Sequence, residues 1–110
     1  MAPSIDIETF KKDSESGSAP ILLDVRRKDD YEQAPQMLPG AAWRDPQKID
    51  TWIQSLPQNS IVVTYCVKGG PVSQSTVDRL RKEGFNASFL EGGLKAWVAG
   101  GNPVENVRTA

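Results

Sequence analysis

The sequence contains no histidine and a single cysteine, Cys66. Without histidine, the chain has neither a cysteine–histidine nor a serine–histidine catalytic pair, and no imidazole to ligate a metal. One cysteine cannot form an internal disulfide, so we expect a reducing, cytoplasmic setting. We also expect no metal and no cofactor. Any nucleophilic reaction of Cys66 then requires a thiolate that is activated only by the protein groups around it.

Long hydrophobic runs are also missing, since no apolar stretch approaches the roughly 20 residues of a transmembrane helix. The amino end lacks the basic and then apolar pattern of a secretory signal. The 13 Lys and Arg residues are spread along the chain, and the formal net charge is −1. This balance argues against nucleic acid or a membrane as a partner. We expect residues 1–110 to form one domain, and the protein to be a monomer.

Segments typical of strands and of helices alternate along the chain, which predicts an α/β fold with a mostly parallel sheet and helices on its faces. The predicted strands are residues 21–25, 61–65 and 86–90. The predicted helices are residues 7–14, 29–34, 49–56 and 74–83, with a short one carrying Leu94 and Trp97. Asp6, Asp45 and Ser73 are the expected helix caps. We expect the tail from Gly100 onward to be irregular.

Cys66 follows the apolar run Ile61–Tyr65 and opens the loop that leads to the helix after Ser73. A thiol between the carboxyl end of a strand and the amino end of a helix occupies a common functional position in α/β sheets. The N–H groups of such a loop and the helix dipole favour an anion, here the thiolate. Glycines at 69 and 70 allow positive φ angles, and Lys68 adds a cation, whereas Pro71 offers no N–H. The expected active-site loop is Val67, Lys68, Gly69, Gly70, Pro71, Val72 and Ser73.

Each of these residues also has a plainer interpretation. A single free cysteine is often a small buried hydrophobic residue, and Lys68 alone is typical of a solvated surface. Val72 fits a hydrophobic staple with Val77. Asp24, at the end of a neighbouring strand, either orients the loop or forms a local turn. The residues Arg26, Arg27 and Lys28 form a basic edge that is more typical of a solvated face than of a site.

Three segments, taken in order, resemble the rhodanese family of single-domain sulfurtransferases. The first comprises Leu22-Leu23-Asp24-Val25-Arg26, Asp30-Tyr31 and Leu38-Pro39-Gly40-Ala41. The second is Val62-Val63-Thr64-Tyr65-Cys66 with its glycine-containing loop. The third is Leu90-Glu91-Gly92-Gly93-Leu94-Lys95-Ala96-Trp97. The resemblance implies a core over about residues 5–104, with a five-stranded parallel sheet wrapped by helices. It also implies that Cys66 takes a sulfane sulfur from thiosulfate, polysulfide or a persulfide, holds it as a persulfide, and passes it to cyanide, a thiol or a partner protein.

The loop departs from the family pattern in two ways. Val72 stands where the family usually carries an arginine, and the loop from Cys66 to Ser73 is one residue longer than in ordinary sulfurtransferases. The longer loop is similar to that of the family's phosphatase and arsenate reductase branch, which needs the arginine to clamp an oxyanion. Its absence disfavours phosphate or arsenate chemistry and makes a less charged sulfur donor more attractive. Arg44 is a weaker candidate to replace the missing arginine.

The sequence therefore predicts a sulfurtransferase that uses Cys66 as its nucleophile, with Asp24, Arg26 and Arg44 in supporting positions. One alternative is a catalytically weak persulfide carrier, or a regulatory module whose cysteine senses oxidants. Another, supported only by loop length, is a phosphatase or arsenate reductase.

Overall fold

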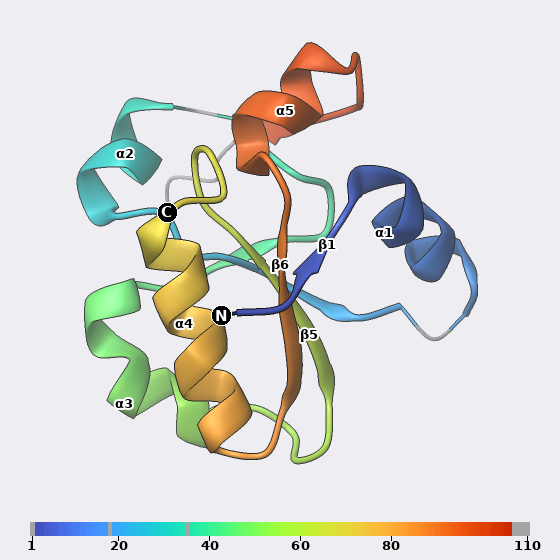
Figure 1. Ribbon diagram of the computed structural model, residues 1–110. Helices are drawn as coiled ribbons and strands as arrows, with labels where there is room; N and C mark the ends of the chain where they lie inside the picture. The colour runs from blue at the N-terminus through green and yellow to red at the C-terminus, as the bar shows by residue number, and fades with distance from the viewer. Residues whose placement is uncertain (1, 18, 35, 107–110) are drawn as a thin grey trace.

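The computed structural model describes residues 2–17, 19–34 and 36–106, and its centre is a five-stranded sheet. The strands lie in the order β1-β6-β5-β2-β4, and every neighbouring pair is parallel. Their bounds are β1 (Ser4–Ile5), β2 (Ile21–Asp24), β4 (Ala42–Trp43), β5 (Ile61–Tyr65) and β6 (Asn86–Leu90). Figure 1 shows β5 and β6 side by side in the middle of the molecule. The α/β class and the five-stranded parallel sheet are thus confirmed.

Helices cover both faces of this sheet. Side chains along each strand alternate between the two faces, so the apolar residues of the central strands need a covering helix layer on each side. On one face, Leu23 and Val62 pack in a cluster with Val77 of α4. On the other, Leu22 and Val63 pack in a cluster with residues of α1 and α5. The helices are α1 (Ile7–Glu15), α2 (Lys28–Gln33), α3 (Ile49–Trp52), α4 (Pro71–Lys82) and α5 (Gly93–Ala99).

Most predicted elements form close to their expected bounds. The observed β5 and β6 match the predicted strands, and Asp6 caps α1 by accepting a hydrogen bond from Thr9 N at 2.8 Å. Asp45 caps a short 3₁₀ helix, η1 (Pro46–Lys48). The helix predicted over 49–56 is divided into α3 and a second 3₁₀ turn, η2 (Ile53–Ser55). Tighter turns of this kind are common at helix ends, and no interior proline or glycine causes the division.

Two predicted features are wrong. The helix after the Cys66 loop begins at Pro71, and its N-cap is Gly70 rather than Ser73. Proline suits this first position because its missing N–H has no partner to lose there. Ser73 and Val72 therefore lie inside α4, and the proposed staple does not form. The tail is also less irregular than expected, since β7 (Glu105–Asn106) pairs antiparallel with β3 (Gln36–Met37), while residues 107–110 of the tail lie outside the described range.

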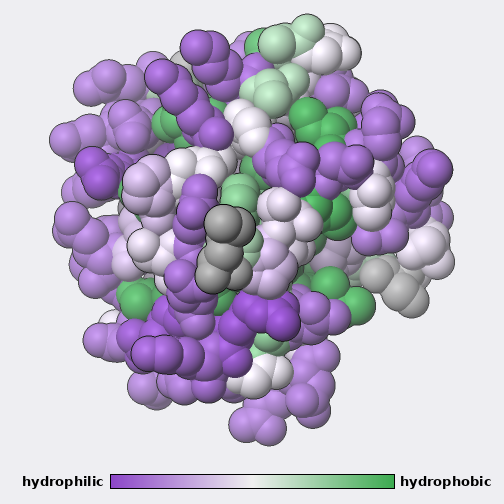
Figure 2. Space-filling model, in the orientation of Figure 1, coloured by the Kyte–Doolittle hydropathy of each residue, from purple (hydrophilic) through white to green (hydrophobic). Residues whose placement is uncertain are grey.

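The visible surface is mostly hydrophilic, with hydrophobic residues in small separate patches (Figure 2). Within the described ranges, none of the helices combines the length and the apolar character needed to cross a bilayer.

Candidate active site

Cys66 lies directly after β5, at the carboxyl edge of the sheet. Its side chain is mostly covered, with 7% of its surface exposed, yet it lines a pocket of about 380 Å³. Lys68, Val72 and other loop residues line this pocket, together with Arg26, Arg27 and Asp30 from the segment after β2. The strand β2 neighbours β5 in the sheet, so the segment after β2 meets the segment after β5 at the same edge. Cys66 thus lies in a pocket that carries two exposed cations, Arg27 and Lys68, and one exposed carboxylate, Asp30.

Backbone hydrogen bonds fix the loop around the sulfur. Gly70 N–H donates to Sγ of Cys66 at 3.3 Å. On the opposite side, Leu94 N–H donates to the Cys66 carbonyl and Lys95 N–H to the Val67 carbonyl, each at 2.9 Å. The start of α5 therefore binds carbonyl groups of the loop, while an N–H of the loop faces the sulfur. This polarity favours a thiolate or a persulfide anion at Sγ.

Two glycines make this close packing possible. Gly69 has φ +72°, whereas Gly70 has φ −88°, so only Gly69 uses the positive φ that both glycines allow. Gly93, at the start of α5, has φ +59°, and a Cβ at this position would lie 2.3 Å from the Cys66 carbonyl oxygen. Side chains at Gly93 are therefore excluded both by the backbone conformation and by the loop. The second glycine of the pair in the third sequence segment therefore packs directly on the loop that holds Cys66.

A buried polar cluster of Asp24, Arg26 and Tyr65 lies beside the site. The Arg26 guanidinium forms an ion pair with Asp24 at 2.7 Å, with both side chains inaccessible to solvent. The Tyr65 hydroxyl donates to the Asp24 carboxylate at 3.0 Å and accepts a hydrogen bond from Leu38 N at 3.1 Å. Burial, and then the Asp24 charge, raise the pKa of the Tyr65 phenol well above its usual range. The prediction of a solvated face is wrong for Arg26, which is buried and pairs with Asp24 two residues earlier, while Tyr65 from a distant strand binds Asp24 in turn.

Asp24 forms the local turn considered for it and also contacts the strand that precedes Cys66. Its carboxylate accepts a hydrogen bond from Arg26 N at 3.0 Å, which closes a local turn. Through Tyr65 it also binds the residue that immediately precedes Cys66. Asp24 thereby links the end of β2 to the end of β5.

Ser73 and Arg44 are placed away from the sulfur. Ser73 is fully buried and shares a 2.7 Å hydrogen bond with the Thr64 hydroxyl, joining α4 to β5. The Arg44 guanidinium donates to the Trp43 carbonyl at 2.9 Å, and Arg44 is absent from the lining of the Cys66 pocket. In the part of the chain that the structure describes, no three Cys, Asp or Glu side chains gather as metal ligands would.

Arg27 is the residue that sequence reasoning missed. It lies in the exposed turn between β2 and α2 and lines the pocket together with Cys66. Arg27 follows Arg26 and precedes Lys28 in the sequence, and a run of three cations is typical of a solvated surface. The available signal was its place just after a central parallel strand, where ligands of α/β sheets commonly bind.

Comparison with known proteins agrees with this geometry. The Rhodanese-like domain family matches residues 6–100. A tRNA sulfurtransferase from Desulfurococcus amylolyticus is 38% identical over 80 residues, which are 73% of this chain and 15% of that protein. The chain spans only 13–15% of the length of the curated relatives that it matches.

Solved structures give the same result over the whole fold. A rhodanese-like domain protein from Staphylococcus aureus has a TM-score of 0.79 at 26% identity, covering 97% of this chain and 99% of that one. A thiosulfate sulfurtransferase from Pseudomonas aeruginosa has a TM-score of 0.81 at 25% identity, covering 97% of this chain and 20% of that one. The match over residues 6–100, on a five-stranded parallel sheet with Cys66 at its carboxyl edge, makes this chain a member of the Rhodanese-like domain family.

Proposed function

We propose that this chain is a sulfurtransferase domain that carries a sulfane sulfur on Cys66. The observation that carries this proposal is the setting of Sγ, which accepts the Gly70 N–H and lines an open pocket with Arg27 and Lys68. A sulfur-transfer reaction needs a nucleophilic thiolate and a site that accommodates an anion, both of which this setting favours. The sulfurtransferase names among its relatives support the same reaction class.

In the first half of the reaction, the Cys66 thiolate attacks the outer sulfur of the donor. With thiosulfate, a bond forms between Sγ and that sulfur, the donor S–S bond breaks, and its electron pair leaves with sulfite. The product is a Cys66 persulfide anion, which the Gly70 N–H is placed to stabilise. In the second half, a thiol or cyanide attacks the outer sulfur and releases the Cys66 thiolate. Neither half needs a general base, in keeping with the absence of histidine.

The test is intact-protein mass spectrometry after brief exposure to thiosulfate and, separately, to inorganic polysulfide. We expect wild type to gain one sulfur, and cyanide or a thiol to remove it. The Cys66→Ser variant, which keeps the size of the side chain but not the nucleophile, should gain none. If Cys66 alkylates readily but gains no sulfur from either donor, the proposal is wrong and a regulatory module becomes the better interpretation.

Repeated turnover distinguishes an enzyme from a carrier. A sulfurtransferase should release product continuously when donor and acceptor are both in excess. A carrier dedicated to one partner protein should load once and then cycle poorly with small acceptors. The same assay with an aryl phosphate tests the phosphatase alternative, for which we expect no hydrolysis because Val72 replaces the oxyanion-clamping arginine.

A further inference from the structure

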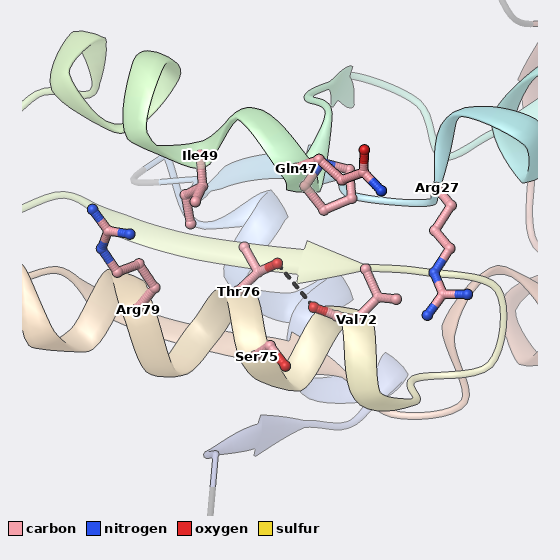
Figure 3. Close-up of a pocket in the computed structure, with 8 residues that line it drawn as sticks. Arg27, Gln47, Ile49, Val72, Ser75, Thr76 and Arg79 are labelled. Carbon is pink, nitrogen blue, oxygen red and sulfur yellow. Dashed lines mark hydrogen bonds between the residues drawn. The ribbon is translucent and has the colours of Figure 1, made fainter.

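A second pocket, of about 320 Å³, adjoins the pocket that contains Cys66. It lies between α4 and the segment formed by η1 and the start of α3, with Ile49 and Thr76 on its facing walls (Figure 3). Arg27 and Val72 line both pockets. The two pockets therefore adjoin at Arg27 and Val72, and we call the pair the donor groove, with Cys66 lining one part and Arg79 lining the other.

Val72 lies where the two parts of the donor groove adjoin. It lies in the first turn of α4, and its carbonyl accepts a hydrogen bond from the Thr76 hydroxyl at 2.8 Å (Figure 3). Its side chain ends at two methyl groups and offers no hydrogen-bond donor. An arginine at this position would extend a long cationic side chain into the groove and divide it. The valine thus makes room beyond Cys66 for a molecule larger than a small inorganic ion.

Arg27 is the cation available at the junction of the two pockets, and its side chain extends toward Val72 and the loop (Figure 3). Among the described residues, Arg27 forms no ion pair. Arg79, by contrast, pairs with Asp50 at 2.6 Å. Lys28, the residue after Arg27, pairs with Glu32 at 3.9 Å and lies outside the groove. A planar guanidinium free of a protein partner is well suited to bind a carboxylate with two hydrogen bonds.

We infer that the donor groove binds the organic part of a low-molecular-weight thiol persulfide, with Arg27 binding a carboxylate of that donor. This inference rests on the sulfur transfer proposed above and adds the subsite that would select one of the expected donors, with the residues that form it. Each half of the groove falls near the lower end of the volumes that small-molecule sites usually have, so the whole groove accommodates a peptide-sized thiol. Thiosulfate needs only the half that contains Cys66.

The transfer from such a donor is balanced without any other reactant. The Cys66 thiolate attacks the outer sulfur of RSSH, and a new bond forms between Sγ and that sulfur. The donor S–S bond breaks, and its electron pair leaves on the inner sulfur as the thiolate RS⁻. The proton of RSSH stays on the product, which is the Cys66 persulfide. No external oxidant or reductant is consumed.

The test measures how fast Cys66 is loaded at increasing concentrations of glutathione persulfide and, in parallel, of inorganic polysulfide, which has no organic part. Arg27→Ala should raise the half-saturating concentration of glutathione persulfide about tenfold, since a lost hydrogen-bonded charge pair has roughly that effect. Arg27→Lys should restore part of the loss. Lys28→Ala removes a neighbouring charge outside the groove and should change nothing.

Ser75 offers a test at the part of the groove away from Cys66. It is exposed and lines the second pocket but not the first, so a substitution there does not touch the sulfur site. Ser75→Glu should weaken loading from glutathione persulfide by repelling its carboxylates, and should affect loading from polysulfide less, because polysulfide has no organic part to occupy this half of the groove. Ser75→Gln, of the same size without the charge, should have a smaller effect.

Three results would overturn the inference. If Arg27→Ala and Ser75→Glu leave the ratio of the two half-saturating concentrations unchanged while Cys66 still loads, the groove does not select the donor, and sulfur transfer itself stands. If wild type loads only from a protein-bound persulfide, the donor class is wrong. If wild type loads from no donor, the proposed function fails together with this inference.

Discussion

Arg26 and Arg27 are adjacent in the sequence, yet they belong to two different kinds of polar site. Arg26 is 1% exposed and paired with Asp24, and Tyr65 completes the buried polar cluster. Arg27 is exposed, lies along the donor groove, and forms no ion pair among the described residues. The first site has all its partners within the protein, whereas the second still has hydrogen-bonding capacity to offer a ligand.

The difference follows from the cost of burying charge. A buried ion must be paired and hydrogen-bonded, because removal from water is otherwise too costly. The buried polar cluster meets this condition by connecting β2, β5 and the backbone of Leu38. It therefore holds in register the strand ends on which the loop stands, while the exposed cations of the groove remain free to bind. Substitutions in the cluster should alter stability, and substitutions in the groove should alter binding.

The largest expected effect comes from breaking the cluster with Asp24→Ala. This change leaves the Arg26 guanidinium buried without a counter-charge and the Tyr65 hydroxyl without its acceptor. Removing one partner of a buried pair typically costs about 3–5 kcal/mol in the free energy of unfolding. Urea denaturation measures this loss. Asp78→Ala on the exposed side of α4 is the matched control and should change stability by less than about 0.5 kcal/mol.

Gly93→Ala should have the next largest effect, and it acts on the loop rather than on the cluster. The added Cβ would have to lie 2.3 Å from the Cys66 carbonyl oxygen and 2.8 Å from Gly69 N. We expect a loss on the order of 2–3 kcal/mol from backbone strain and overpacking, with slower loading of Cys66. Gly101→Ala is the control, because Gly101 also has a positive φ but no atom within 4 Å of the added Cβ. Equal losses in both variants would mean that the conformation alone, and not contact with the loop, requires glycine at position 93.

The sequence predicted the parts of the fold that depend on neighbouring residues. The segments predicted as strands at 61–65 and 86–90 became β5 and β6, and Cys66 directly follows β5 as predicted. The start of α4 was missed because Ser73 is a good capping residue, although Pro71 is an equally local signal for a first helical position. In the folded chain, Ser73 is instead buried against Thr64 of β5.

What the sequence could not predict depends on residues far apart in the chain. The third residue of the buried polar cluster, Tyr65, hydrogen-bonds to Asp24 but lies 41 residues after it in the chain. Only two residues of the tail pair with β3, too few for a pattern to appear. The role of Arg27 depends on the strand order, which brings the turn after β2 beside the loop after β5. None of these relations has a local signature.

Tyr65→Phe should have a smaller effect that depends on pH. The change removes the hydroxyl that donates to Asp24 and accepts from Leu38 N, which should cost about 1–2 kcal/mol at neutral pH. In wild type the folded state keeps the phenol proton because burial and Asp24 raise its pKa, while the unfolded chain releases this proton near pH 10. The folded state then binds more protons, so stability falls as the pH rises above 10.

Tyr65→Phe removes this contribution, so the cost of the substitution should shrink above pH 10. The difference in slope between the two proteins is at most one proton, or about 1.4 kcal/mol per pH unit. Denaturation curves between pH 8 and about 11 measure the difference at each pH. Parallel slopes would contradict the buried, proton-retaining state of Tyr65.

Arg27→Ala should have the smallest effect on stability, and it tests the contrast between Arg26 and Arg27 most directly. Its side chain is exposed and forms no ion pair among the described residues, so we expect the free energy of unfolding to change by less than about 0.5 kcal/mol. Arg26→Ala, one residue earlier, should cost several times more because it leaves the Asp24 carboxylate buried and unpaired. Thermal and urea denaturation of both variants measure the contrast. If Arg27→Ala proved as destabilising as Arg26→Ala, Arg27 would be a structural residue, and weaker donor loading in that variant would reflect a damaged fold rather than a lost binding contact.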